Sequence, residues 1–288
     1  MPTSVTPPMP EVITRAADFR AHIETRRTAR QTVGLVPTMG ALHAGHASLV
    51  EAARGDCDVV AATLFVNPKQ FGPGEDFDRY PRGLDADRRL LADAGCDLVF
   101  CPSVDEMYPA GSATSIDVGA AGRVLEGAFR PTHFAGVATV VLKLFNLAPA
   151  DRAYFGRKDY QQTVVVRRMV ADLNVPIEVV VCPTVRDADG LAMSSRNAYL
   201  SPAERVRALA LSRGLRLAEQ MHAGGERRAS AFRESIEQLL TDAGAAVQYV
   251  AVLEPGTVDE IAEVEGKAVI AVAAMVGQTR LIDNATIG

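Results

Sequence analysis

The stretch Thr32-Val-Gly-Leu-Val-Pro-Thr-Met-Gly-Ala-Leu-His-Ala-Gly-His46 begins as an apolar run and ends as a glycine-containing polar loop. The run from Thr32 to Val36 predicts a short buried strand, which Pro37 ends. A helix is expected to begin near Gly45, so the loop joins the carboxyl end of a strand to the amino end of a helix. This order is typical of α/β folds, in which such loops bind ligands.

The same alternation continues along the chain. Strands that are apolar throughout indicate a parallel sheet covered on both faces. We therefore predict an α/β protein with a Rossmann-like, doubly wound parallel sheet. The expected strands cover residues 32–36, 58–66, 97–101, 152–155 and 177–182, and the expected helices cover 12–27, 45–54, 84–94, 134–147 and 159–173.

A second, smaller domain is expected after the parallel sheet. Ser201-Pro-Ala-Glu204 has the N-cap serine, first-turn proline and capping-box glutamate of a helix start. Another helix is expected over residues 227–243, and strand-like runs follow at 247–253, 268–276 and 279–283. We predict a Rossmann-like domain of residues 1–185 and a C-terminal α+β domain of residues 186–288 that acts as a lid.

Composition excludes several classes of protein. The chain has 288 residues, 48% of them hydrophobic, and a net charge of −5, which argues against a general nucleic-acid or membrane-surface binder. The proline-rich start, residues 1–10, lacks the layout of a signal peptide, and no uncharged apolar run reaches about 18 residues. The four cysteines lie in apolar surroundings without Cys-x-x-Cys spacing, which predicts reduced thiols. We expect a cytoplasmic protein with no nucleic-acid or membrane partner.

His43 and His46 are the sharpest chemical feature. They lie three residues apart at a helix start and therefore share one face. The free N–H groups of a helix start attract anions, and imidazole N–H groups there can hold phosphate oxygens. Gly40 and Gly45 let a nucleotide approach the backbone closely. Two alternatives stay open: a zinc site, although no Glu or Cys accompanies the pair, and a purely structural pair of polar residues.

Other polar segments offer phosphate and hydroxyl contacts. In residues 155–162, Gly156 permits close backbone approach, Lys158 can neutralise phosphate, and Asp159 can accept from a ribose hydroxyl or merely cap a helix. The segment 184–197 carries cationic and hydroxyl donors suited to a triphosphate: Arg186, Ser194, Ser195 and Arg196.

Two further polar segments follow. Gln70, in the turn-rich segment 64–81, can recognise a carboxylate or hydroxyls, and Arg130-Pro-Thr-His-Phe134 leads into a helix. The Walker loop, the Gly-x-Ser-x-Gly elbow and the Gly-x-Gly-x-x-Gly fingerprint do not occur in the sequence. Their absence weighs against P-loop, hydrolase and dinucleotide chemistry.

Together these motifs resemble a known family. His43-Ala-Gly-His46 combined with Met193-Ser-Ser-Arg196 resembles the nucleotidyl-transferase superfamily, which shares a His-x-Gly-His signature with class I aminoacyl-tRNA synthetases. The match is closer to the pantothenate synthetases and covers nearly the whole chain from Val12 onward. Four motifs carry it in order: Pro37–His46, Phe65-Val-Asn-Pro-x-Gln-Phe71, Gly156-x-Lys-Asp-Tyr-Gln-Gln162 and Gly190–Asn197.

The resemblance implies a two-step reaction. Pantoate and ATP would give pantoyl-adenylate and pyrophosphate with the help of Mg²⁺, and β-alanine would then displace AMP to give pantothenate. The protein would position reactants and stabilise charge, because the carboxylate of pantoate is itself the nucleophile. Residues 1–185 would bind nucleotide and pantoate. The family also implies a homodimer.

The resemblance further implies a role for each residue that matches a motif. The catalytic residues would be His43, His46, Lys158 and Arg196. ATP would contact Pro37, Thr38, Met39, Gly40, His46, Gly156, Lys158, Asp159, Val185, Met193, Ser194, Ser195 and Arg196. Pantoate would contact Met39, Gln70, Gln162, Arg130 and His133.

Two further expectations concern the metal ion and one position at which this chain departs from the family pattern. Mg²⁺ would be held through the ATP phosphates, with Asp85 and Asp87 as conceivable carboxylate ligands. The family usually has Arg-Pro-Gly-His-Phe where this chain has Arg130-Pro-Thr132-His-Phe134. A threonine there would be strained at a positive φ, which bears on the roles of Arg130 and His133.

Alternatives come from two classes. The first is another transferase of the superfamily, either cytidylyltransferase-like or a truncated tRNA synthetase. The acidic chain without a basic stripe disfavours the synthetase, and the segments around Gln70 and Gln162 disfavour the cytidylyltransferase. The second is a silent nucleotide-binding module, against which the intact His43, His46, Lys158 and Arg196 argue.

Overall fold

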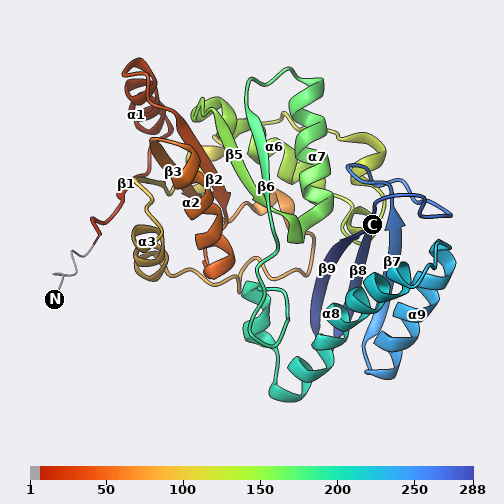
Figure 1. Ribbon diagram of the computed structural model, residues 1–288. Coiled ribbons are helices and arrows are strands. Elements are labelled where there is room, and N and C mark those ends of the chain that lie inside the picture. Colours follow the sequence, from red (N-terminus) through yellow and green to blue (C-terminus); the bar gives the residue numbers. More distant parts are fainter. Residues whose placement is uncertain (1–6) are drawn as a thin grey trace, which may run out of the picture. The chain divides into compact units, whose positions relative to one another are not determined.

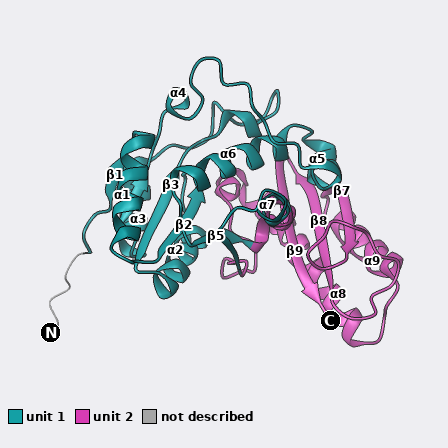
Figure 2. Ribbon diagram, turned by 90° about the horizontal axis from the view of Figure 1, so that it is seen from above, with its two compact units in different colours: residues 1–156, 165–182 teal, residues 157–164, 183–288 magenta. Residues whose placement is uncertain are grey.

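The computed structural model describes residues 7–288, so most of the proline-rich start lies outside the described residues. The chain forms two compact units (Figure 2). The first contains the described residues up to Gly156 together with Val165–Cys182, and the second contains Arg157–Val164 and Pro183–Gly288. We expected the boundary between residues 185 and 186. In the structure the second unit instead resumes at Pro183 and also includes Arg157–Val164.

The first unit contains a parallel sheet of six strands in the order β1-β4-β3-β2-β5-β6 (Figure 1). The Rossmann-like α/β class is confirmed. The strands are β1 (Glu11–Ile13), β2 (Val33–Thr38), β3 (Val59–Leu64), β4 (Leu98–Phe100), β5 (Arg152–Gly156) and β6 (Glu178–Cys182).

The beginning of the first expected helix is wrong. Residues 11–13 form the edge strand β1, paired with Leu98–Phe100 of β4, and helix α1 begins only at Ala16. Three residues are too few to show a strand period in the sequence. The strand forms because β4 offers it a ladder of backbone groups, and that pairing joins residues far apart in the chain.

Helices cover both faces of this sheet. The strand residues alternate: Val33 and Leu35 pack with α1 and α6 in one core, whereas Val36 packs with α2 and α3 in another. The helices of this unit are α1 (Ala16–Thr28), α2 (Ala44–Asp56), α3 (Leu84–Asp93), α4 (Val104–Met107), α5 (Glu126–Phe129), α6 (His133–Leu147) and α7 (Tyr160–Asp172), the last beginning in the other unit. Apolar burial on both faces explains why the strands are apolar throughout.

The strand order reverses between β2 and β5. From β2 the chain continues to its neighbour β3, whereas from β5 it continues to β6 on the other side. Leu35 of β2 is paired with Ala153 of β5, so these two strands lie side by side. The carboxyl ends of strands at such a reversal are where open α/β sheets bind ligands. The segments that begin at Met39 and at Gly156 leave these two ends.

The second unit has an antiparallel sheet of β7 (Ala246–Leu253), β8 (Ala268–Val276) and β9 (Thr279–Ile287), with helices α8 (Pro202–Ala223) and α9 (Ala229–Asp242) packed on it (Figure 1). The smaller α+β unit is therefore present. The predicted capping box is also present: Ser201 Oγ accepts from Glu204 N at 3.3 Å, and Glu204 Oε2 accepts from Ser201 N at 2.9 Å. Strand β9 is longer than its expected end at Asp283. Within residues 7–288, no helix combines the length and the apolar character that a membrane crossing requires.

Candidate active site

The loop after β2 is held in an uncommon backbone conformation. Gly40 and Ala41 have φ of +88° and +53°, and the second value is unfavourable for a residue with a Cβ atom. Asp87 of α3 stabilises this turn, because its Oδ2 accepts from Ala41 N at 3.0 Å and its Oδ1 from Leu42 N at 2.8 Å. Both carboxylate oxygens of Asp87 are thus bound to the loop. Asp87 acts here as an anchor of the loop.

The loop delivers two histidines to the start of α2. His43 is the N-cap, and its Nδ1 accepts from Gly45 N at 3.1 Å, while His46 Nδ1 accepts from His43 N at 3.3 Å. The two ring centroids lie 4.1 Å apart. A ring nitrogen that accepts a hydrogen bond carries no proton, so each neutral ring has its proton on Nε2. Both Nε2–H groups are therefore donors at a helix start, where an oxyanion is stabilised.

This arrangement bears on the alternatives for the pair. The backbone contacts of both Nδ1 atoms give the histidines a structural role as helix caps and place the proton of each ring on Nε2. Among the described residues 7–288, no group of three or more His, Cys, Asp or Glu side chains is arranged to hold a metal ion.

Gln70 is buried beside this loop with its amide in a fixed orientation. Its Oε1 accepts from Asn67 Nδ2 at 3.1 Å, so its Nε2 donor faces the other way, toward Met39 Sδ at 2.8 Å. Asn67 is only 1% exposed, and its Nδ2 also donates to Gly136 O at 3.1 Å. Thioether sulfur is a weak acceptor. The Nε2 group of Gln70 therefore suits a stronger acceptor such as a carboxylate or a hydroxyl.

The orientation of Asn67 is itself fixed by two donors. Its Oδ1 accepts from the Tyr108 hydroxyl at 2.9 Å and from Lys69 N at 3.3 Å. Burial raises the pKa of Tyr108 to about 12, which keeps this donor protonated. Helix α6 approaches closely at Gly136, where a Cβ atom would lie 2.2 Å from Lys69 O. Tyr108 and Asn67 were not assigned from the sequence, although Asn67 lies inside the motif Phe65–Phe71.

Arg130 and His133 contact the protein around Gln70. Arg130 forms a two-pronged ion pair with Glu75, with Nε–Oε1 at 2.8 Å and Nη2–Oε2 at 2.5 Å, and Nη2 also donates to Gln70 O at 3.2 Å. His133 Nδ1 lies 2.9 Å from Gln70 O, a pure acceptor, so Nδ1 carries the proton and Nε2 accepts from Arg130 Nη1 at 3.2 Å. These contacts show how both side chains brace Gln70 and Glu75.

Burial and the nearby Arg130 determine the protonation states of His133 and Glu75. Desolvation, followed by the charge of Arg130, lowers the pKa of His133 to about 4, so its ring is neutral at pH 7. Burial acts to raise the pKa of Glu75, but the hydrogen bonds and charge of Arg130 outweigh it and hold this pKa below its usual value. Thr132 has φ of −97°, an ordinary value for any residue. The threonine in place of the usual glycine is therefore unstrained.

Gly156 ends β5 beside open space. Its φ is not positive, and a Cβ atom built there would meet no atom within 4 Å. Nothing in the protein therefore requires a glycine at this position, whereas a ligand lying against the backbone would.

The remaining expected residues belong to the second unit. Lys158 and Asp159 follow in a short 3₁₀ turn, with Lys158 Nζ 3.5 Å from Asp159 Oδ1, and Gln162 lies in the first turns of α7. The segment 185–193 folds back on itself, because Met193 N donates to Val185 O at 3.0 Å. Ser194 Oγ accepts from Arg196 N at 3.2 Å and begins the 3₁₀ helix Ser195–Tyr199. Arg186 is bound to the buried Asp283, with Nη1 2.6 Å from Oδ2.

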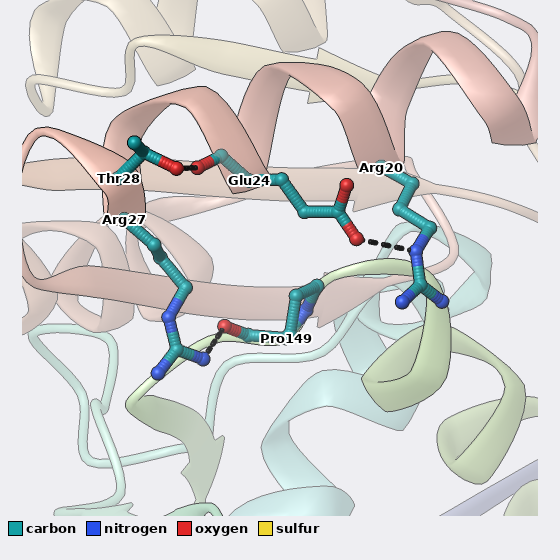
Figure 3. Close-up of a pocket in the computed structure, with 5 residues that line it drawn as sticks. All are labelled: Arg20, Glu24, Arg27, Thr28 and Pro149. Atoms are coloured by element: carbon teal, nitrogen blue, oxygen red, sulfur yellow. Dashed lines mark hydrogen bonds and ion pairs between the residues drawn. The ribbon is translucent and has the colours of Figure 1, made fainter.

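A pocket at the surface of α1 contains none of the expected residues. Arg20, Glu24, Arg27, Thr28 and Pro149 line it (Figure 3). Arg20 Nε binds Glu24 Oε1 at 2.7 Å, and Arg27 donates to Pro149 O. Because these cations already have partners within the protein, the pocket offers little to an anionic ligand.

The parallel sheet and the histidine pair at its reversal point define a Rossmann-like protein with a helix start suited to an anionic ligand. Comparison with known proteins specifies the family: a family model described as pantoate-beta-alanine ligase matches residues 11–286. The pantothenate synthetase of Moorella thermoacetica is 52% identical over 275 residues, which are 95% of this chain and 97% of that protein. Pantothenate synthetase 1 of Bradyrhizobium diazoefficiens is 50% identical over 280 residues.

Solved structures agree with this assignment. The pantothenate synthetase of Thermus thermophilus is 48% identical, with a TM-score of 0.91 over 96% of this chain and 98% of that one. The pantoate-beta-alanine ligase of Francisella tularensis, solved with beta-gamma ATP and beta-alanine, is 33% identical with a TM-score of 0.80 over 96% and 97%. The chain belongs to the pantoate–β-alanine ligase family. As a member, it is a ligase that joins pantoate and β-alanine to form pantothenate.

Proposed function

We propose that this ligase activates pantoate with ATP as pantoyl-adenylate and that His43 and His46 stabilise the charge on the reacting phosphates. The observation that carries the proposal is the pair of Nε2–H donors at the start of α2, whose tautomers the backbone fixes through Nδ1. Donors that are already oriented stabilise a transition state without reorganising. The relative of Francisella tularensis was solved with beta-gamma ATP, which supports ATP as the nucleotide.

The other nucleotide contacts follow the motif residues. Pro37, Thr38, Met39 and Gly40 would contact ATP along the loop after β2. Gly156 would lie against the nucleotide, with Asp159 on its ribose and Lys158 on its phosphates. The open space beside Gly156 supports this close approach. The triphosphate would contact the segment of Val185, Met193, Ser194, Ser195 and Arg196.

Pantoate would bind at Gln70. The outward Nε2–H group of Gln70 is a donor for the carboxylate or a hydroxyl of the acid, and Met39 would line the same pocket. Gln162 would provide a second amide. Arg130 and His133 would act through Gln70, whose carbonyl they bind, in place of the direct pantoate contact that their motif suggests.

The proposed chemistry needs no covalent enzyme intermediate. In the first step, a carboxylate oxygen of pantoate attacks the α-phosphorus, the bond from that phosphorus to the bridging oxygen breaks, and pyrophosphate leaves. In the second, the neutral amine of β-alanine attacks the acyl carbon, loses a proton, and expels AMP. His43, His46, Lys158 and Arg196 would balance the negative charge that develops in the first step.

Mg²⁺, the homodimer and the cytoplasmic location stay predictions. Mg²⁺ prefers phosphate and carboxylate oxygens, so we propose that it arrives on the ATP phosphates and neutralises part of their charge. Asp85 is exposed and Asp87 is bound to the loop.

Product analysis tests the proposed function. The purified protein is incubated with ATP, Mg²⁺, pantoate and β-alanine, and the products are separated by chromatography. We expect pantothenate, AMP and pyrophosphate in equal amounts. Phosphate and ADP in place of AMP would contradict an adenylate, a nucleotide-linked ester would indicate a cytidylyltransferase-like activity, and the absence of any product from a folded protein would indicate a silent module.

A further inference from the structure

Strand β9 holds the Lys158 segment through one side chain. Asn284 Nδ2 donates to Arg157 O and to Lys158 O, both at 2.9 Å. A nitrogen with two hydrogens can serve two carbonyl oxygens, whereas the amide oxygen cannot, so the orientation of this amide is determined. These bonds and those of Tyr160 to the turn at Gly256 and Thr257 explain why residues 157–164 belong to the C-terminal unit.

Asp283, the residue before Asn284 in β9, holds the other segment of expected ATP contacts, residues 185–196. Asp283 is 3% exposed and accepts from Arg186 twice, at Nη1–Oδ2 2.6 Å and Nη2–Oδ1 3.0 Å. Arg186 begins the fold-back of residues 185–193, where it is bridged to Ala192. Asp283 Oδ1 also accepts from Asn284 N at 2.8 Å, which links the two anchors.

The burial of the Asn284 side chain lowers the stability of the folded protein, so stability does not explain an asparagine at this position. The residue is 4% exposed, and its Oδ1 has no hydrogen-bond partner among the described residues. A buried acceptor without a partner destabilises the folded state, and an apolar side chain would fill this strand position without that cost. We explain the asparagine by the two hydrogen bonds that its Nδ2 group donates to Arg157 O and Lys158 O.

We propose that Asp283 and Asn284 are positioning residues for ATP, because they fix both nucleotide-binding segments of the C-terminal unit on one strand. Asn284 fixes the backbone from which the Lys158 side chain extends, and Asp283 fixes the base of the segment that carries Ser194–Arg196. This inference rests on the proposed function, in which those two segments bind the nucleotide. Neither Asp283 nor Asn284 is expected to touch ATP.

A double-mutant cycle on the full chain tests the proposal. The variants are Asn284→Asp, Lys158→Ala and the combination, and the dissociation constant of ATP is measured by calorimetry together with the melting temperature. Asn284→Asp keeps the shape but places an oxygen against the two carbonyls. We expect this variant and Lys158→Ala each to raise the ATP dissociation constant tenfold or more, and Lys158→Ala to add less than threefold in the Asn284→Asp background.

Matched variants separate positioning from stability. Ile287→Val removes one methylene from the buried end of the same strand without touching either segment, and its ATP affinity should stay within twofold of the original. Asp283→Asn weakens the Arg186 contact and should raise the ATP dissociation constant severalfold. If Asn284→Asp does not fold, Asn284→Ser, which retains one hydroxyl donor, takes its place in the double-mutant cycle.

Three outcomes would overturn the proposal in distinguishable ways. Unchanged ATP affinity in the Asn284 variants with a large effect of Lys158→Ala would remove the inference and leave the proposed function intact. Fully additive losses in the double variant would show that Asn284 does not act through Lys158, and the positioning role would be lost. Unchanged affinity in Lys158→Ala alone would remove Lys158 from the proposed nucleotide site, and the inference with it.

Discussion

The amide of Gln70 can present only one of its two ends to a substrate, because Asn67 binds the other. Asn67 in turn makes four hydrogen bonds to the protein, through which Tyr108 and the backbone at Gly136 fix its orientation. A buried amide that is fully satisfied cannot rotate without losing several bonds. The donor at Gln70 Nε2 is therefore already oriented, which would reduce the ordering that the proposed binding of pantoate requires.

Removal of the Tyr108 hydroxyl should make the orientation of the Asn67 and Gln70 amides less fixed. In Tyr108→Phe, Asn67 Oδ1 loses its closer donor, and we expect the KM for pantoate to rise about five- to tenfold, which corresponds to about 1 kcal/mol. The KM for ATP should change less than twofold. Steady-state kinetics with each substrate varied in turn measure both values, and Tyr199→Phe, at an exposed tyrosine, is the control. An equal rise in both KM values would contradict a role at the acid site.

Sequence patterns predicted a binding role for Gln70 but not the side chains that orient it. Gln70 lies in a recognisable motif, whereas the Tyr108–Asn67 bond joins residues 41 positions apart and exists only in the folded chain. The contact of Asn284 with Lys158 spans 126 positions. Tautomers are likewise absent from the sequence, because the proton position on His43 and His46 follows from the acceptors and donors around each ring.

At the scale of elements, α3 determines the conformation of the loop before α2. The left-handed backbone at Ala41 is unfavourable by about 1 kcal/mol or more, and the two bonds to Asp87 offset that cost. The histidines begin two residues after this turn. Their placement at the helix start therefore depends on an acidic side chain from a different helix.

Asp87→Asn should release this loop. An amide can accept from only one of the two N–H groups and directs its own NH₂ group at the other, so we expect a loss of about 1 to 3 kcal/mol in the free energy of unfolding. The rate of adenylate formation should fall at least tenfold. Urea unfolding and single-turnover kinetics measure the two effects. Asp85→Asn, in the exposed first turn of the same helix, should change neither, and a fully active Asp87→Asn would contradict the anchoring role.

Most elements could be predicted because their apolar periods are local. Strands β2 to β6 and helices α2, α3, α6 and α7 lie within a few residues of their expected bounds. Strand β1 was missed because its three residues form a strand only by pairing with β4. The membership of residues 157–164 in the C-terminal unit was also missed, since it depends on contacts with β9 and with the turn at Gly256.

At the scale of the whole molecule, the neutral His133 makes stability depend on pH. Its pKa is about 4 in the folded protein and near 6.5 in the unfolded chain, so the unfolded state binds more protons between these values. The free energy of unfolding should therefore fall as pH drops from 6.5 to 4, by about 2 to 3 kcal/mol from this residue. The lowered pKa of Glu75 acts in the same direction.

Urea unfolding at several pH values measures this dependence. In His133→Asn the slope of the free energy against pH between 4.5 and 6.5 should become shallower, because the proton-linked group is gone. His222→Asn, in helix α8 of the other unit, should leave the slope unchanged. An identical slope in His133→Asn and the original protein would mean that His133 is not held neutral.

The central proposal, which rests on the fold and the two histidines, is that the ligase forms an acyl-adenylate before the amine arrives. Exchange of labelled pyrophosphate into ATP, with Mg²⁺ and pantoate but without β-alanine, tests this claim most directly. We predict exchange that requires pantoate and that falls a hundredfold or more in His43→Ala, about 3 kcal/mol of transition-state stabilisation. Exchange without pantoate, or no exchange by a folded protein that makes pantothenate when β-alanine is added, would contradict the account.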